Sequence, residues 1–413
     1  MQKILNSLKR VPIDEVVVGM HLEDVYNNKG TLLLSANMMI TSDEQVTKLK
    51  KRGVTTVLVN VGKGKDAPCA TEPKQISATH SPDPLNKNRT ESHRERAYYL
   101  ELDRAKQMHL QTLETTRETL HAARMGKPVL VTEVEKASEG MVESIMRNPD
   151  ALVSLAQIKG YDEYTYVHSV NVSIFSTSLA HSMGYDSESL LQIGIGGILH
   201  DIGKMQVPDY ILNKPGKLTN AEYGVMKKHP VYGLEMVKQR NTISELSKSV
   251  IIEHHERYDG TGYPRGLKGD QIREMGLIAA VADVYDAITT DRVYRSAWTP
   301  QKALGIIFKG CEREFSRRIV ELFTRHLGIY PVGSFIRLNN GEMGVVVRVE
   351  KGFLLAPNVL ILFSSDQKRL HTPVEYTLSE KQKGEDGESY KISSSLDPKP
   401  FGVNISDYIQ GKM

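Results

Sequence analysis

The stretch "ESLLQIGIGGILHDIGK", Glu188–Lys204, decides the fold of the middle of this chain. Its apolar residues recur at intervals of three and four, which predicts a buried helix. Gly194, Gly196 and Gly197 interrupt that pattern, and each costs about 1 kcal/mol of helix propensity relative to alanine. A helix that keeps three glycines at such a cost is expected to let a neighbouring backbone approach it closely.

The end of this predicted helix is polar. His200 and Asp201 stand there, and Lys204 follows one turn later. A buried aspartate that lacks a cation or hydrogen-bond donors is costly. A metal ion is the simplest partner for Asp201, and a salt bridge to Lys204 is the structural alternative.

Other side chains that can bind metal occur in the neighbouring helical segments. His168 shares a helical stripe with apolar residues of "YVHSVNVSIFSTSLA", so we expect it to point inward, either as a core histidine or as a ligand. Asp283 lies in the nearly apolar "MGLIAAVADVYDAITTDR", where a carboxylate needs a partner. Asp286, one turn later, is expected to support the site rather than bind metal. The remaining candidates are His229, which precedes Pro230, and the pair His254 and His255.

Imidazoles combined with a few carboxylates suit transition metals. Seven candidate ligands exceed the four of one structural zinc site. If Asp201 bridges, each of two ions receives four protein ligands and keeps positions open for water and substrate. Two such ions clamp the attacking and leaving oxygens of a phosphate ester. The residues alone therefore predict a metal-dependent hydrolase of phosphate esters, without naming the ester.

Several motifs occur here in a characteristic order: "GILHDIGK", "LNKPGKLTNAEY", "KKHPVYG", "IIEHHERYDGTGYP" and "ADVYDAITTDRVYR". On these motifs the chain resembles, from Lys136 to Tyr330, the HD-GYP family of cyclic-dinucleotide phosphodiesterases. The resemblance implies a helical HD-superfamily domain with two divalent transition-metal ions, iron or manganese. It assigns one ion to His168, His200, Asp201 and Asp283. The other ion falls to His229, His254 and His255, with Asp201 as the bridge.

The resemblance also implies roles for residues that bind no metal. Lys204 is expected beside the scissile phosphate, and Arg292 and Arg295 are expected on the phosphates of the substrate. A solvated helix end is the alternative for the two arginines. Tyr263 either stacks on a guanine or packs the Gly-Tyr-Pro loop. Tyr164 occupies the position where some members carry an acid that binds a third metal, so we expect two ions.

The predicted function is hydrolysis of cyclic di-GMP to linear pGpG, with GMP as a further product, by attack of metal-activated hydroxide on phosphorus. The alternative substrate is 3′,3′-cyclic GMP-AMP, which presents the same phosphates. An alternative of another class is a sensor that binds cyclic dinucleotides with little turnover. A phosphohydrolase of nucleoside phosphates is disfavoured by the His254–His255 pair and the Gly-Tyr-Pro loop.

The fold is predicted to be mainly α, with a small N-terminal α/β domain and a short C-terminal β appendage. Residues 1–61 form the α/β unit, which resembles a domain of unstated function that often precedes the catalytic domain, and we expect a regulatory role for it. Residues 62–93 are predicted to be a linker, residues 94–135 a connecting helical segment and residues 136–330 the catalytic domain. In residues 331–413, Asn340-Gly341 predicts a hairpin.

Composition limits the partners and the location. The formal net charge of +3 over 413 residues gives no reason to expect binding to a nucleic-acid polymer. No apolar run approaches the roughly 18 residues of a membrane span. Two cysteines in different parts of the chain suit a reducing compartment. We therefore expect a cytoplasmic protein without a membrane partner, and leave a homodimer or a signalling partner open.

Overall fold

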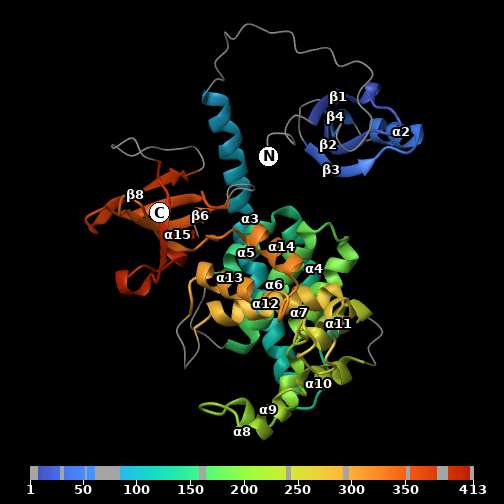
Figure 1. The fold of residues 1–413 in the computed structure, drawn as a ribbon, viewed down its shortest axis with the longest axis vertical. Coiled ribbons are helices and arrows are strands. Elements are labelled where there is room, and N and C mark those ends of the chain that lie inside the picture. Colours follow the sequence, from blue (N-terminus) through green and yellow to red (C-terminus); the bar gives the residue numbers. More distant parts are fainter. Residues whose placement is uncertain are drawn as a thin grey trace. The chain divides into compact units, whose positions relative to one another are not determined.

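The computed structural model describes residues 8–27, 32–51, 54–60, 84–157, 164–238, 243–291, 297–349, 354–378 and 389–409 (Figure 1). The chain divides into two compact units, Met1–Lys87 and Asn88–Met413. The predicted class is confirmed, because helices dominate the second unit, the first unit is α/β and a small sheet follows residue 335.

The N-terminal unit is built on one antiparallel sheet in the order β1-β4-β2-β3. Its elements are β1 (Leu8–Pro12), η1 (Ile13–Glu15), β2 (His21–Asn27), β3 (Leu32–Met39), α2 (Asp43–Lys51) and β4 (Val54–Asn60). Alternate residues of β4, Val57 and Val59, are fully buried, and Val46 of α2 lies in the same core. Period-two burial on the strands and one apolar stripe on α2 explain why a helix covers one face of this sheet.

A long helix, α3 (Pro84–Arg124), leads into the helical part of the second unit. It begins inside the stretch 62–93 that we expected to be linker, rather than at Arg94. The part of that stretch between residues 61 and 83 lies outside the described residues. Polar contacts fix α3 to its neighbours, since Glu101 accepts a hydrogen bond of 2.8 Å from Ser144 and a second from Arg147.

The helical core of the second unit carries the segments that the sequence singled out. Its elements are α4 (Val131–Arg147), α5 (Pro149–Gln157), α6 (Tyr164–Ser182), α7 (Ser187–Leu199), η2 (Ile202–Gln206), α8 (Asp209–Leu212), α9 (Asn220–Met226), α10 (His229–Val237), α11 (Glu245–Glu253), η3 (Gly269–Gln271), α12 (Glu274–Thr289), α13 (Pro300–Lys309) and α14 (Arg317–Leu327).

The glycines of α7 allow close packing on both sides of this helix. A Cβ atom on Gly197 would lie 2.5 Å from the Cα of Ser173 in α6. On Gly196 it would lie 2.7 Å from the Cβ of Val250 in α11. The expectation that these glycines permit close approach is thus confirmed. Because α6 and α11 both press on α7, the end of α7 lies where the ligand-bearing segments meet.

Helix α12 is held beside α6 by an aromatic cluster. The rings of Phe175 and Tyr285 lie 5.4 Å apart between centroids, and Tyr285 lies 5.2 Å from Phe323 of α14. All three side chains are fully buried and meet edge to face, a favoured arrangement of aromatic rings. This packing fixes the face of α12 that carries Asp283 and Asp286 toward α6.

The C-terminal part of the second unit is a five-stranded antiparallel sheet in the order β8-β7-β6-β5-β9. Its elements are β5 (Phe335–Leu338), β6 (Met343–Arg348), β7 (Asn358–Phe363), β8 (Arg369–Thr377), β9 (Ile392–Leu396), η5 (Lys399–Phe401) and α15 (Ser406–Ile409). The predicted hairpin at Asn340-Gly341 is confirmed, and Gly341 has the positive φ of 93° that such turns require. Strand β7 is buried along its whole length, as its unbroken apolar run indicates.

Among the described helices, none combines the length and the apolar character that crossing a bilayer requires.

Candidate metal centre

The structure brings all seven predicted metal ligands into one buried place. They come from the second turn of α6, the middle of α12, the residues just after α7, the start of α10 and the residues just after α11. Two sets form, each with its ligand atoms within 4.8 Å of one another: Asp201, His229, His254 and His255 in one, and His168, His200 and Asp283 in the other. This grouping matches the division between two ions that the resemblance implied.

The adjacent histidines reach the same cluster because the helix ends there. Helix α11 stops at Glu253, and His254 occupies its C-cap. Neighbouring residues inside a helix point about 100° apart. At the end of α11 the backbone leaves the helical path, so His254 and His255 stand with their rings only 4.2 Å apart between centroids.

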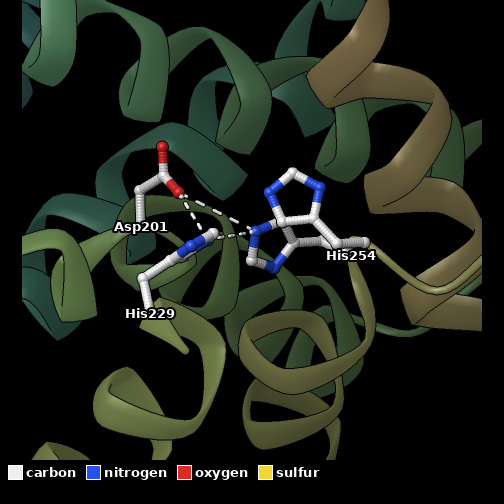
Figure 2. A group of neighbouring side chains, drawn as sticks. Asp201, His229 and His254 are labelled. Carbon is white, nitrogen blue, oxygen red and sulfur yellow. Dashed lines mark hydrogen bonds and ion pairs between the residues drawn. The ribbon is translucent and has the colours of Figure 1, made fainter. Parts of the chain in front are cut away.

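Asp201 lies between the two sets, and Figure 2 shows its contacts with His229 and His254. Its Oδ1 is 3.2 Å from Nε2 of His229 and 3.8 Å from Nε2 of His254. Its Oδ2 is 3.4 Å from Nε2 of His200 and 3.9 Å from Nε2 of His168. One carboxylate thus offers one oxygen to each set, which is the geometry that a bridging ligand needs.

The histidines direct unprotonated nitrogens at the centre. In His200, His229 and His254, Nδ1 lies 2.8–2.9 Å from a backbone carbonyl oxygen, of Gly197, Met226 and Ile251 respectively. A carbonyl only accepts hydrogen bonds, so Nδ1 carries a proton, and in the neutral form of each ring Nε2 presents a lone pair.

Two observations show that a cation fits among these lone pairs. Nε2 of His229 and Nε2 of His254 face each other at 3.2 Å, although two lone pairs cannot hydrogen-bond. Nε2 of His200 is buried and has no hydrogen-bond partner. One divalent ion in each set would satisfy these nitrogens, and nitrogen with carboxylate donors suits a transition metal.

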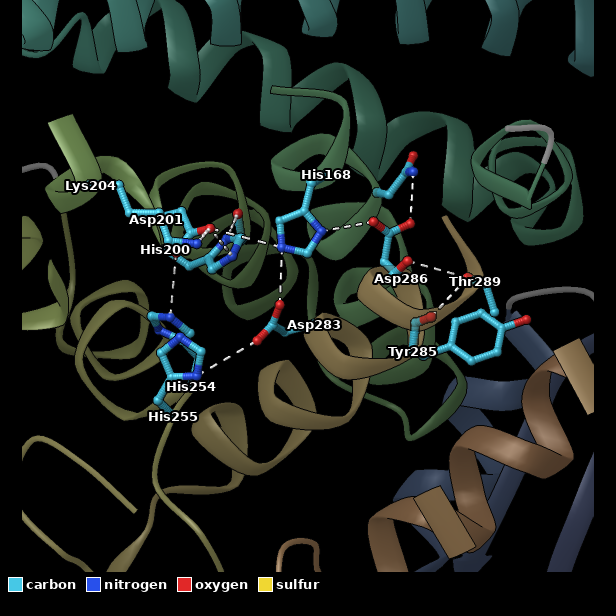
Figure 3. A network of polar contacts seen from close by, with 12 residues as sticks. His168, His200, Asp201, Lys204, His254, His255, Asp283, Tyr285, Asp286 and Thr289 are labelled. Carbon is cyan, nitrogen blue, oxygen red and sulfur yellow. Dashed lines mark hydrogen bonds and ion pairs between the residues drawn. The ribbon is translucent and has the colours of Figure 1, made fainter. Parts of the chain in front are cut away.

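His168 is oriented from behind by Asp286 (Figure 3). Nδ1 of His168 lies 2.8 Å from Oδ2 of Asp286, whose Oδ1 accepts a hydrogen bond of 2.9 Å from Asn171. Nε2 of His168 then faces Oδ1 of Asp283 at 3.0 Å. A carboxylate behind a ligating histidine fixes its tautomer and raises its basicity. This is the supporting role that the sequence predicted for Asp286.

The electrostatics of the cluster favour neutral rings and charged carboxylates. Burial, with the neighbouring imidazoles, holds the pKa of His254 well below its usual range, and burial lowers the pKa of His255 to about 3. Burial also opposes charge on His168, yet hydrogen bonds to Asp283 and Asp286 raise its pKa to about 9. A cation between His168 and Asp283 would take the place of that proton.

The two ligand carboxylates stay ionised although burial alone raises the pKa of a carboxyl group. The charge of Lys204 and the His200 ring hold the pKa of Asp201 well below its usual range. The hydrogen bond from His168 lowers that of Asp283. The centre therefore carries negative charge that a metal ion would neutralise.

Of the four residues predicted to act on the substrate, two lie beside the metal-ligand cluster and two lie outside the described residues. The ammonium group of Lys204 contacts Oδ2 of Asp201, and a quarter of the side chain remains exposed. The ring of Tyr263 lies against His255, 4.7 Å away between centroids and tilted by 32°. This placement is compatible with packing of the loop, and stacking on a base stays a prediction. Arg292 and Arg295 lie outside the described residues.

Sequence reasoning missed two acids that shape the loop of Tyr263. Glu256 is buried and accepts hydrogen bonds from the backbone N–H groups of Arg265 and Leu267, at 2.8 and 3.0 Å. Glu253, also buried, accepts one of 2.8 Å from the backbone of Arg273. The available signal was the pattern "EHHE", in which an acid stands on each side of the histidine pair.

The fold and the clustered side chains define a helical protein with a buried group of histidines and aspartates that could hold metal. A family described as HD domain matches residues 142–318. A domain of unknown function (DUF3391) matches residues 8–134, and a KOW domain associated with HD domain matches residues 335–383.

Curated relatives place the chain more narrowly. A cyclic di-GMP phosphodiesterase of Pseudomonas aeruginosa is 34% identical over 368 residues, covering 87% of this chain and 86% of the relative. A 3′3′-cGAMP-specific phosphodiesterase of Vibrio cholerae is 34% identical over 188 residues, covering 45% of this chain and 36% of the relative. Among solved structures, Bd1817 of Bdellovibrio bacteriovorus, an HDG"Y"P protein, is 18% identical with a TM-score of 0.46, covering 76% of this chain and 98% of its own. The chain belongs to the HD-GYP family of cyclic-dinucleotide phosphodiesterases.

Proposed function

We propose that this chain hydrolyses cyclic di-GMP, opening the ring to linear pGpG at a centre of two divalent transition-metal ions. The observation that carries the proposal is Asp201, whose two oxygens face two separate sets of ligands. The relative from Pseudomonas aeruginosa, which matches this chain along most of both lengths, supports the choice of substrate.

The ligand roles in this proposal follow the two sets. His168, His200 and Asp283 would hold one ion, and His229, His254 and His255 would hold the other, with Asp201 shared. When bound, such a pair of ions lowers the pKa of a water molecule toward neutrality and neutralises charge on phosphoryl oxygens. Iron or manganese fits the mixture of imidazole and carboxylate donors.

Side chains of the protein protonate the leaving group and bind the phosphates. Water adds to phosphorus and releases one proton to solvent, from which Lys204 is reprotonated after the reaction. The bond from phosphorus to the 3′ oxygen breaks, and that oxygen needs one proton to leave as a hydroxyl group. The ammonium group of Lys204 donates it, because Asp201 holds the group at the edge of the cluster while part of the side chain reaches solvent. Asp201 cannot supply the proton, since its low pKa keeps it ionised. Arg292 and Arg295 bind the phosphates, in keeping with the bidentate geometry of guanidinium groups.

The second candidate substrate is 3′,3′-cyclic GMP-AMP. It is favoured by the relative from Vibrio cholerae, whose match covers 36% of that protein. Both substrates present the same phosphates, so the metal ligands do not discriminate between them. Base contacts must decide, and the two substrates therefore need direct comparison.

The test is a turnover assay on protein purified without oxygen and loaded separately with iron and with manganese. Cyclic di-GMP and 3′,3′-cyclic GMP-AMP are offered side by side. Asp201→Asn is the inactive variant, and Asp270→Asn, the same change at an exposed position of η3, is its matched control. We expect cyclic di-GMP to be opened by the wild type and by Asp270→Asn only. Tight binding without turnover under either metal would refute the proposal and indicate a sensor.

A further inference from the structure

The last residue of α3 makes direct contact with the turn that follows the metal-binding His200–Asp201 pair. Nη1 of Arg124 donates a hydrogen bond of 2.8 Å to the carbonyl oxygen of Met205 and another of 2.8 Å to that of Val207. Its Nη2 contacts Asp209. Arg124 lies within the stretch matched by the domain of unknown function, and before the stretch matched by the HD domain.

The two carbonyls belong to the end of the short helix η2. The last carbonyls of a helix have no partner within it, and the negative end of the helix dipole lies there. A guanidinium group is suited to this place because it is always charged and carries several donors in one plane. Val207 is fully buried with Arg124 in place, and its carbonyl accepts its hydrogen bond from that guanidinium group.

Helix η2 also connects the two ligand sets with Lys204. It begins directly after Asp201 and contains Lys204. On its other side it presses on α10, because a Cβ atom on Gly203 would collide with the carbonyl oxygen of His229. Helix η2 is thus confined between Arg124 and the start of α10. A shift of η2 would move Lys204 relative to Asp201 and His229.

We propose that Arg124 is a positioning residue for hydrolysis, which holds η2 so that Lys204 faces the leaving oxygen. The inference rests on the proposed role of Lys204. The C-terminal end of the stretch matched by the domain of unknown function then contributes to the catalytic centre, because helix α3 holds η2 from outside the segment matched by the HD domain. Arg124 touches neither metal ligands nor substrate and acts through η2 alone.

The experiment uses the full chain with both ions loaded and measures kcat and KM per metal-loaded protein. We expect Arg124→Ala to lower kcat about 10- to 100-fold with KM changed less than about twofold, because the placement of Lys204 beside the leaving oxygen suffers and substrate binding does not. Metal content and the unfolding temperature are measured on the same samples. Millimolar guanidinium chloride should restore part of the lost kcat, because the exposed quarter of the Arg124 side chain opens the vacated place to solvent. Sodium chloride at equal concentration should not.

Two further variants make the result decisive. Asp209→Ala removes the ion pair and leaves both carbonyl contacts, so its kcat should stay within about twofold of the wild type. Arg124→Lys keeps the charge but donates through a single group, and we expect an intermediate loss of about three- to tenfold. This variant replaces Arg124→Ala if the alanine protein does not fold.

Wild-type kcat in Arg124→Ala, or in Arg124→Lys where it stands in, would overturn the inference. So would a loss that vanishes once activity is expressed per metal-loaded, folded chain, because Arg124 would then be structural only. Absence of turnover in the wild type is a different outcome, which would refute the proposed function itself.

Discussion

Replacing Asp286 by asparagine should selectively weaken the ion held by His168. In the structure Asp286 is fully buried and its two oxygens face Nδ1 of His168 at 2.8 Å and the amide of Asn171 at 2.9 Å. Both neighbours require an acceptor. Asparagine offers only one oxygen, so its amide group must face one of two donors.

Either arrangement of the amide harms the site. If the oxygen serves Asn171, the NH₂ group faces Nδ1 of His168, which must then accept and shift its proton to Nε2. A protonated Nε2 cannot bind a metal. If the oxygen serves His168, the amide of Asn171 must turn over to accept from the new NH₂ group, and in both arrangements the negative charge behind His168 is lost. Loss of such a supporting carboxylate typically weakens metal binding about 10- to 100-fold, which corresponds to about 1.4–2.7 kcal/mol.

The assay is equilibrium dialysis of manganese-loaded protein against graded chelator buffers, followed by metal analysis. We expect the wild type and the control Asp270→Asn to keep two ions over the same range of free metal. Asp286→Asn should keep one ion over that range and lose the other at a free-metal concentration about 10- to 100-fold higher. Retention of both ions with wild-type affinity would show that Asp286 does not orient His168 as argued.

Three other perturbations test the packing of α7, the charge of Glu101 and the stabilisation of the fold by bound metal. Gly197→Ala places a Cβ 2.5 Å from the backbone of Ser173 and should destabilise the chain by about 1–3 kcal/mol, read from the urea midpoint; an unchanged midpoint would contradict this packing. Burial opposes charge on Glu101, yet hydrogen bonds from Arg147 and Ser144 lower its pKa. Its stabilisation should therefore be complete above the unfolded value of about 4.3 and vanish as pH falls through the folded value. The stability gap between wild type and Glu101→Gln, measured by urea unfolding, should shrink below about pH 4; a gap independent of pH would exclude this origin. Chelation should lower the unfolding temperature of the wild type, and added metal should restore it more fully than in Asp201→Asn; equal recovery would argue against Asp201 as a shared ligand.

Local patterns were sufficient to predict much of the helical domain. The apolar stripe of α6 predicted that His168 points inward, and the structure buries it. The glycines of α7 predicted close approach of a backbone, and α6 supplies it at Ser173. Each prediction succeeded because its cause lies within a few residues of the pattern.

Other features escaped because their causes are distant in sequence. Strand β8 is largely exposed and β9 is short, and pairing with β7 and β5 stabilises them rather than a strong pattern of their own. The start of α3 at Pro84 was hidden by a polar composition typical of linkers. No pattern around Arg124 indicates the carbonyls of Met205 and Val207, which lie about eighty positions further along the chain.

The sequence by itself determined the helical class, the seven candidate ligands and the small sheets at either end, because periodicity, turn chemistry and residue type are local properties. Only the tertiary structure decided which oxygen of Asp201 faces which set, which nitrogen of each histidine points inward and which helix supports η2. These depend on the meeting of α3, α6, α7, α10, α11 and α12. Hydrogen bonds between these helices, such as the one from His168 to Asp286, fix the orientation of side chains. The sequence identifies these side chains but does not determine where they point.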